Sequence, residues 1–182
     1  MPITTLLPRH AAPALDLPLA GGKRFVLGTA PAEHFDMLLF YRGLHCPICA
    51  KYLADFEKSS SEFASRGVQI TAVSTDTEER ATKMAEKVNG SGVKIAYGLS
   101  LQDARHWGLF ISGSLGKTSL GIEEPKLFSE PAVYLIKPDG TLYYSAVQSM
   151  PFARPSAQDL LAAIDFAIAK DYPARGEYLG PV

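Results

Sequence analysis

Apolar and polar positions along the chain follow two different periods, which together predict strands alternating with helices. Residues 36–41 (DMLLFY) form an apolar run, typical of a strand buried on both faces of a sheet. Apolar residues then recur at helical spacing from Ile48 to Phe63, and Gly67 is expected to end this helix. Residues 68–74 (VQITAVS) predict the next buried strand.

Capping signals predict where the later helices begin and end. Thr75 and Glu78 form a capping box, with Asp76 as an alternative cap, and Asn89-Gly90 is expected to end the helix that follows. The remaining predicted elements are a strand at 23–28, a strand at 93–99, a short helix at 101–110, an irregular segment at 111–130, a β-hairpin at 132–147 around Pro138-Asp139-Gly140, and a last helix opened by Ser156 with Asp159.

This order of elements predicts an α/β fold. Strands that alternate with helices favour a parallel sheet with helices on both faces, and the hairpin adds antiparallel strands. The predicted organisation is an N-terminal arm at 1–22, one domain at 23–170 and a C-terminal tail at 171–182.

Composition narrows the function classes. The chain has 182 residues, 47% of them hydrophobic, and a net charge of −1, so it can bury a core and carries no basic footprint for nucleic acid or membrane surfaces. No apolar run is long enough to span a bilayer, and the N-terminus lacks the basic and apolar regions of a signal peptide. We therefore expect a cytoplasmic protein, in which a pair of cysteines is more often catalytic or metal-binding than structural.

Both cysteines lie at the predicted turn from the strand at 36–41 into the following helix. Cys46 occupies the N-cap position and Pro47 the first helical position, where a missing N–H does no harm. A helix N-terminus lowers the pKa of a thiol, and Cys49 follows one turn later. The spacing predicts an exposed, activated thiol at Cys46 and a partly buried resolving thiol at Cys49, as thiol–disulfide exchange requires.

Two other interpretations of the cysteines remain open. A zinc site needs two more ligands, but the chain has no second cysteine pair and its histidines, His10, His34, His45 and His106, show no metal-binding spacing. Two inert core cysteines would fit poorly with the mouth of a helix. A redox pair is the favoured interpretation.

Residues beside the cysteines have structural and functional interpretations. His45 favours the Cys46 thiolate if it is protonated, and is otherwise a loop histidine. Arg42 either steadies the thiolate or pairs with a surface acid. Tyr41 is expected to pack under the helix, and Glu123 and Glu124 are expected to lie in a solvated loop.

The segments LLFYRGLHCPIC, VQITAVSTDT, EPAVYLIKPDGTLYYSA and YPARGE together resemble the peroxiredoxin-like proteins of the AhpC/TSA group, within the thioredoxin superfamily. The resemblance spans about residues 15–178 and implies a thioredoxin-like fold, a central mixed sheet flanked by helices. It places Cys46 at the nucleophilic position and Cys49 at the resolving one. It also implies a cis-proline facing the cysteines, which we assign to Pro131.

The chain departs from the pattern of this group at three positions. Typical peroxiredoxins have Thr or Ser three residues before the nucleophilic cysteine and Pro seven before, where this chain has Gly43 and Leu39. The usual arginine at the start of a later strand aligns with Pro131. Because threonine and arginine polarise the peroxide bond, we expect modest peroxidase efficiency, with Arg42 as a partial substitute.

The resemblance and the cysteine pair predict a thiol-dependent oxidoreductase that reduces peroxides or disulfides. Either route leaves a Cys46–Cys49 disulfide, which an external dithiol of the thioredoxin or glutaredoxin type, or a small thiol, would reduce. No metal, haem, flavin or nucleotide cofactor is implied, and homodimers are common in the group. The alternative is a redox sensor whose disulfide switches a partner surface at 111–130 and the YPARGE tail.

Overall fold

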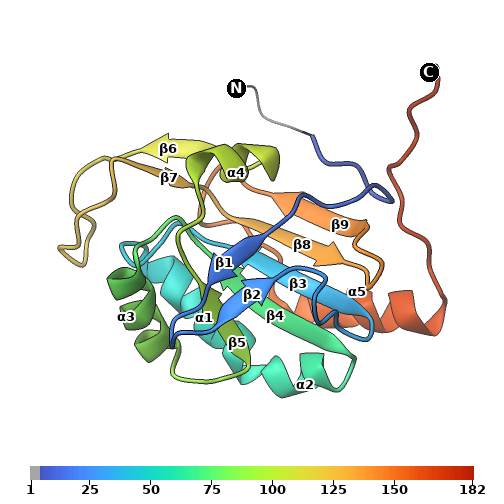
Figure 1. Ribbon diagram of the computed structural model, residues 1–182, viewed down its shortest axis with the longest axis horizontal. Helices are drawn as coiled ribbons and strands as arrows, with labels where there is room; N and C mark the ends of the chain where they lie inside the picture. The colour runs from blue at the N-terminus through green and yellow to red at the C-terminus, as the bar shows by residue number, and fades with distance from the viewer. Residues whose placement is uncertain (1–4) are drawn as a thin grey trace.

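The computed structural model describes residues 5–182 and is built on a five-stranded mixed sheet (Figure 1). Four of its strands run in one direction, and the first strand of the hairpin at 132–147 runs opposite to them, so the sheet combines parallel pairs with an antiparallel hairpin, as the sequence predicts. Across the sheet the order is β5 (Val93–Ala96), β4 (Val68–Val73), β3 (Phe35–Phe40), β8 (Ala132–Ile136) and β9 (Leu142–Val147).

Strand β3 lies at the centre of the sheet, as its five apolar residues favour, and all six of its residues, Asp36 included, are buried. Its side chains alternate between two cores. Phe35, Met37 and Leu39 join one cluster, and Leu38 and Phe40 join the other. The central strand therefore ties both faces of the domain together, and its C-terminal end leads directly to the cysteines.

Four helices contribute to the first cluster: α1 (Pro47–Lys58), α2 (Ser60–Ala64), α3 (Glu78–Val88) and α5 (Ala157–Ala169). The opposite face is covered by α4 (Leu101–His106) and by a hairpin of β1 (Asp16–Pro18) and β2 (Arg24–Val26), which lies in front of the sheet in Figure 1. The predicted N-terminal arm thus supplies Leu15, Leu17 and Leu19 to the core; its first four residues lie outside the described residues.

Several local predictions are confirmed. Asn89 ends α3 in the left-handed conformation, and Ser156 with Asp159 forms the capping box that opens α5. The hairpin at 132–147 forms β8 and β9. The single helix expected to run to Gly67 is instead interrupted at Ser59, whose N–H bonds the carbonyl of Phe56 and lets the chain change direction before α2.

Two predictions are wrong. The capping box of Thr75 and Glu78 does not form, because α3 begins at Glu78 with Thr77 as its N-cap, and Asp76 binds elsewhere. The segment 111–130 is not irregular throughout: β6 (Ile111–Gly113) pairs antiparallel with β7 (Leu127–Ser129), which makes the base of an ordered ribbon.

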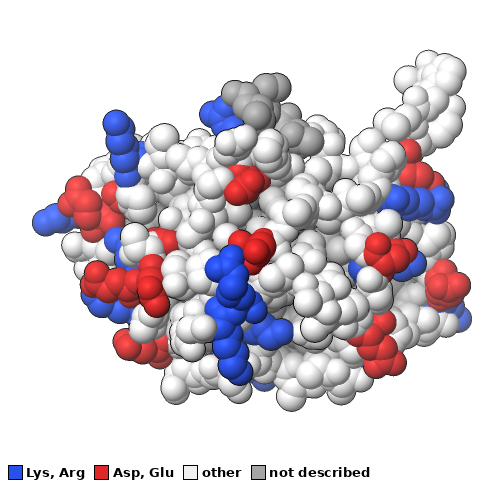
Figure 2. Space-filling view, in the orientation of Figure 1, with Lys and Arg blue, Asp and Glu red and all other residues white. Residues whose placement is uncertain are grey.

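Acidic and basic side chains are interspersed on the face shown in Figure 2, apart from a short basic band near its centre. Within residues 5–182, no helix has the length and apolar character needed to cross a membrane. The same residues include no group of three His, Cys, Asp or Glu side chains placed to hold a metal ion.

Candidate functional site

The two cysteines lie where β3 passes into α1, as predicted. Cys46 is the N-cap of α1, with extended backbone angles of φ −98° and ψ 102°, and Pro47 opens the helix. The Cys46 sulfur accepts a hydrogen bond from the backbone N–H of Cys49 at 3.3 Å. A cysteine thus takes the capping place that serine or aspartate usually fills, so its sulfur faces the unpaired N–H groups of the first turn.

The two thiols have opposite acidities. Hydrogen bonds from the Cys49 side chain and backbone, together with the charges of Arg42 and Arg154, lower the pKa of Cys46 to about 6, although burial opposes the shift. Burial and the neighbouring Cys46 raise the pKa of Cys49 instead. At neutral pH Cys46 is therefore mainly a thiolate and Cys49 a thiol, which is a suitable pairing of nucleophile and proton-bearing partner.

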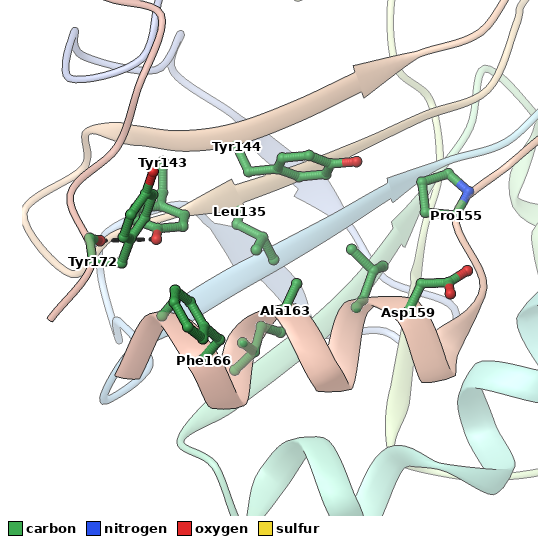
Figure 3. A pocket seen from close by; sticks show the side chains of 11 residues that line it. Leu135, Tyr143, Tyr144, Pro155, Asp159, Ala163, Phe166 and Tyr172 are labelled. Carbon is green, nitrogen blue, oxygen red and sulfur yellow. Dashed lines mark hydrogen bonds between the residues drawn. The ribbon is translucent and has the colours of Figure 1, made fainter. Parts of the chain in front are cut away.

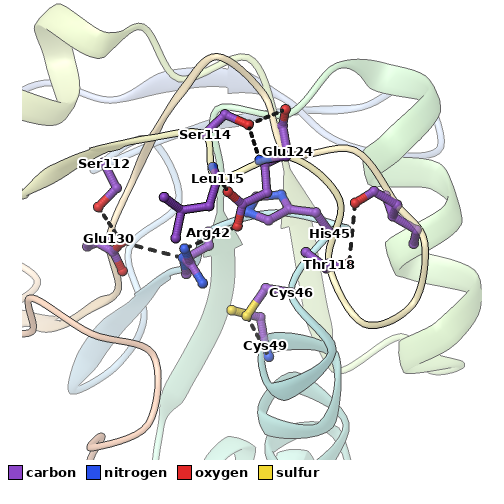
Figure 4. Close-up of polar contacts among 12 residues, drawn as sticks. Arg42, His45, Cys46, Cys49, Ser112, Ser114, Leu115, Thr118, Glu124 and Glu130 are labelled. Carbon is purple, nitrogen blue, oxygen red and sulfur yellow. Dashed lines mark hydrogen bonds and ion pairs between the residues drawn. The ribbon is translucent and has the colours of Figure 1, made fainter.

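Cys46 is not exposed, contrary to expectation: only 3% of it is accessible, and Cys49 is fully buried. The segment between β6 and β7 arches over the cysteines (Figure 4). Local spacing predicts the face of α1 on which the sulfur lies, but it carries no information about a loop that starts more than 60 residues later.

Arg42 lies between two buried carboxylates from distant parts of the chain. Its guanidinium lies 3.4 Å from Glu124 and 3.4 Å from Glu130, and it stacks on the ring of Phe128 at 4.6 Å (Figure 4). Ser112 donates a hydrogen bond to Glu130 at 2.6 Å. The expectation that Glu124 is solvated is wrong, because Glu124 is the buried partner of Arg42; Glu123, beside it, is exposed.

His45 is buried and neutral, so it does not act as the cation that would favour the thiolate. Burial and the charges of Arg42 and Arg80 lower its pKa to about 4. Its ring packs on Phe128 with centroids 4.6 Å apart, and its Nδ1 lies 3.3 Å from the guanidinium of Arg80. His45 therefore contributes packing around Phe128 rather than positive charge near Cys46.

Asp76 fixes the turn that precedes Cys46. Its side chain is fully buried, accepts a hydrogen bond from the N–H of Leu44 at 2.7 Å, and pairs with Arg80 at 2.8 Å. Gly43 has a φ of +134°, and a Cβ added there would lie 2.8 Å from the Asp76 carboxylate. The threonine that typical peroxiredoxins have at this place therefore does not fit this backbone.

We expect Gly43→Ala to lower the free energy of unfolding by roughly 2 kcal/mol or more, since it combines an unfavourable φ with a clash against Asp76. Gly98→Ala is the matched control: Gly98 also has a positive φ, +77°, but has open space around its Cβ position, so its cost should be about 1 kcal/mol. Urea unfolding of the reduced proteins measures both. Equal losses for the two variants would contradict the proposed close contact with Asp76.

Arg154 is a site residue that sequence reasoning missed. It comes from the segment between β9 and α5, stacks on Tyr52 at 4.1 Å, and donates toward the Cys49 sulfur at 3.8 Å. Tyr52 in turn donates to the carbonyl of Pro155 at 2.6 Å. A positive charge close to the N-terminus of a helix is unfavourable, because that end of the helix dipole is also positive. The position of Arg154 just before α5 was the one local sign that its side chain has a partner elsewhere.

Tyr41 and Pro131 are the remaining predicted site residues, and the structure agrees with the prediction for the first and not for the second. Tyr41 is fully buried under α1, as expected, and burial raises its pKa. The prediction of a cis peptide bond at Pro131 is wrong, since the described chain contains none. The carbonyl of Pro131 accepts a hydrogen bond from Gln148 at 2.9 Å, and this pairing with the end of β9 holds the segment without a cis bond.

An apolar pocket of about 480 Å³ lies between β9 and α5 (Figure 3). Tyr143, Tyr144 and Phe166 line it, and Tyr143 donates to the carbonyl of Tyr172 at 2.9 Å. Its one carboxylate, Asp159, is occupied by the cap of α5. The lining includes neither cysteine and no histidine.

Comparisons with known proteins agree with this geometry. Residues 8–145 match the AhpC/TSA family, whereas no curated protein matches the chain. A peroxiredoxin-like protein from Aquifex aeolicus superposes with a TM-score of 0.68 at 18% identity, covering 91% of this chain and 89% of the other. Peroxidoxin BcpB from Mycobacterium tuberculosis gives 0.66 at 19% identity, with 91% and 96% covered. AhpC from Enterococcus faecalis gives 0.69 at 16% identity, with 98% and 100% covered.

At identities this low, the superpositions show a shared fold and no more. The family itself is shown by the AhpC/TSA match, which covers most of the chain. The mixed five-stranded sheet, the helices that flank it and the cysteine at the mouth of α1 fit the same assignment. The chain therefore belongs to the AhpC/TSA family and is a peroxiredoxin-like oxidoreductase of the thioredoxin superfamily.

Proposed function

We propose that this protein is a thiol peroxidase in which Cys46 reduces hydroperoxides and Cys49 resolves the oxidised product. The observation that carries the proposal is the Cys46 sulfur at the N-cap of α1, where it accepts the N–H of Cys49 and has a pKa of about 6. A thiolate is the nucleophilic form of cysteine, and this one is ionised at neutral pH without a histidine base.

The chemistry balances with the groups present. The Cys46 thiolate attacks the terminal oxygen of the hydroperoxide, the O–O bond breaks, and the departing alkoxide takes a proton to leave as an alcohol. Cys46 becomes a sulfenic acid. The sulfur of Cys49 then attacks the sulfur of Cys46, water leaves, and a disulfide forms within the first turn of α1. An external dithiol, of the thioredoxin type or a small thiol, returns both cysteines to the reduced state.

Two arginines are positioned to favour negative charge at the sulfur. Arg42 and Arg154 both lower the pKa of Cys46. Two carboxylates offset the charge of Arg42, whereas Arg154 faces the sulfur of Cys49 and the ring of Tyr52. We propose that Arg42 and Arg154 together supply the stabilisation that an arginine at the position of Pro131 would give in typical peroxiredoxins.

Peroxide is favoured over protein disulfides as the oxidant. Thioredoxin-style exchange uses a cis-proline edge and an exposed nucleophile, whereas here the peptide bond at Pro131 is trans and Cys46 is covered. A hydroperoxide is smaller than a protein disulfide and is therefore the better candidate to reach a residue that is only 3% accessible.

The rate of hydrogen peroxide consumption tests the proposal. At pH 7, a fall in pKa from about 8.5 to about 6 raises the thiolate fraction about 30-fold, while the weaker base is about tenfold less nucleophilic. Ionisation alone therefore gives about a threefold gain over free cysteine. We expect the reduced protein to exceed free cysteine by about 100-fold or more, because oriented cationic donors stabilise the transition state. A second-order rate constant within about threefold of that of free cysteine would be explained by ionisation alone and would contradict the proposed peroxidase function.

A further inference from the structure

Residues 114–126 form a loop on the side of the site where Cys46 lies, and we call it the cover loop. The loop rises from the β6–β7 ribbon, whose base is fixed by pairing of Ile111 with Ser129 and by the hydrogen bond from Glu130 N–H to the Phe110 carbonyl. It passes above the cysteines in Figure 4. Cys46 as a whole residue is only 3% accessible.

The cover loop is internally ordered. The N–H of Glu124 donates to the Gly116 carbonyl at 3.0 Å, and Thr118 donates to Ile122 at 3.0 Å. The N–H of Leu115 donates to the Glu124 carboxylate at 2.7 Å. These bonds join the two sides of the loop to each other, so the loop can move as one unit relative to the β6–β7 pair.

The loop buries little apolar surface. Leu115 is 92% exposed and Leu120 is 50% exposed. Ile122 is the one large apolar side chain of the loop that packs against the core, and it is only partly buried; of residues 114–126 only Glu124 is buried. A segment with few buried apolar contacts opens at low cost in free energy unless polar contacts hold it. Its closed position therefore depends on those polar contacts.

Two polar contacts join the cover loop to the site. Glu124 pairs with Arg42 at 3.4 Å, and Arg80 donates to the backbone carbonyl of Glu123 at 3.3 Å. The Glu124 carboxylate is shared, since one oxygen binds Arg42 and the other the loop at Leu115. Removing this one carboxylate loosens both the loop itself and its attachment beside Cys46.

We propose that the cover loop is a lid and that Glu124 is its latch, which makes Glu124 a residue that determines specificity. The closed lid admits small hydroperoxides to Cys46, and bulky disulfides or organic hydroperoxides react only when it opens. The inference rests on the proposed function for the identity of the oxidant, but the lid itself is testable without any peroxide.

The test compares a small and a bulky thiol reagent in the Cys49→Ser background, where Cys46 is the one remaining cysteine. The reagents are iodoacetamide and the aromatic disulfide 2,2′-dithiodipyridine, both of which are uncharged at neutral pH, so a change in local charge does not favour one of them. We expect Glu124→Gln to raise the ratio of the bulky-reagent rate to the small-reagent rate about tenfold, the size of effect that a lost charge-assisted hydrogen bond has on an opening equilibrium. The ratio cancels any change in the ionisation of Cys46, because both reagents need the thiolate.

Glu123→Gln is the matched control. It removes the same charge from the adjacent, exposed residue, and the contact of residue 123 with Arg80 uses the backbone. We expect its rate ratio to stay within about twofold of the parent, since a solvated charge has little effect on an opening equilibrium. The same ratio in Glu124→Gln and Glu123→Gln would overturn the proposal.

Two measurements keep the proposal testable if Glu124→Gln does not fold. The parent protein should disfavour the bulky reagent over iodoacetamide by about tenfold more than free cysteine does, as a closed lid requires. Trypsin cleaves after Lys117 and Lys126, both in the cover loop. The rate of cleavage at these two sites should rise with the fraction of molecules in which the lid is open. A parent ratio equal to that of free cysteine would show that nothing gates Cys46. Neither result depends on peroxide turnover, so failure of the lid and failure of the peroxidase assignment are distinguishable.

Discussion

Replacing Cys46 with serine is expected to abolish hydrogen peroxide consumption, a loss of at least about 1,000-fold, because a serine hydroxyl does not ionise at neutral pH. Replacing Cys49 with serine should have a different result. Cys46 keeps the backbone N–H of residue 49 at its sulfur, so it should consume one equivalent of peroxide and stop at a sulfenic acid. Stopped-flow peroxide consumption and mass spectrometry of the trapped sulfenic acid measure both variants.

The pair of variants separates the nucleophile from the resolving cysteine. Continued turnover of Cys49→Ser with a dithiol at the parent rate would assign the resolving step to the external thiol rather than to Cys49. Peroxide consumption by Cys46→Ser at the parent rate would contradict the assignment of the nucleophile, since Cys49 is then the one thiol left and its pKa is raised.

Asp76→Ala should produce the largest loss of stability among the site residues, about 3 kcal/mol, because removal of one member of a buried ion pair leaves the other charge without a partner. The carboxylate is fully buried, binds Arg80 at 2.8 Å and accepts the N–H of Leu44 at 2.7 Å. The variant also leaves the Arg80 guanidinium uncompensated beside His45. Urea unfolding at pH 7 measures the loss.

Asp55→Ala is the control for Asp76→Ala. Asp55 pairs with Lys58 across one helical turn of α1, and both side chains are largely solvent-exposed. Its loss should be below about 0.5 kcal/mol, as for most surface ion pairs. Similar losses for the two variants would mean that the network around Asp76 adds nothing to the turn before Cys46.

The parts of the fold that local signals encode were predictable. The apolar run at 36–41 fixes a strand buried on both sides, and the capping residues Ser156 and Asn89 fix helix ends, because both effects act within a few residues. Prediction failed where a contact with a distant part of the chain replaced the interaction that the local sequence favours. Asp76 has the chemistry of a helix cap, but its carboxylate is bound by Arg80 and Leu44.

The cysteine site divides in the same way. The sequence by itself determined that Cys46 caps α1, that Pro47 begins it and that Cys49 lies one turn on, since these are properties of a single helix end. It did not predict Arg154, because the contact with Cys49 joins residues 105 apart.

Only the tertiary structure decided the environment of the sulfur. Glu124 reaches Arg42 across 82 residues of sequence, Cys46 is buried, and burial together with two arginines leaves His45 neutral. The physical reason is that acidity and access depend on every charge and surface within a few ångströms of the atom, whereas periodicity and capping record only neighbours along the chain. The sequence thus placed Cys46 at the start of α1, and the packing of distant segments set how acidic and how accessible its thiol is.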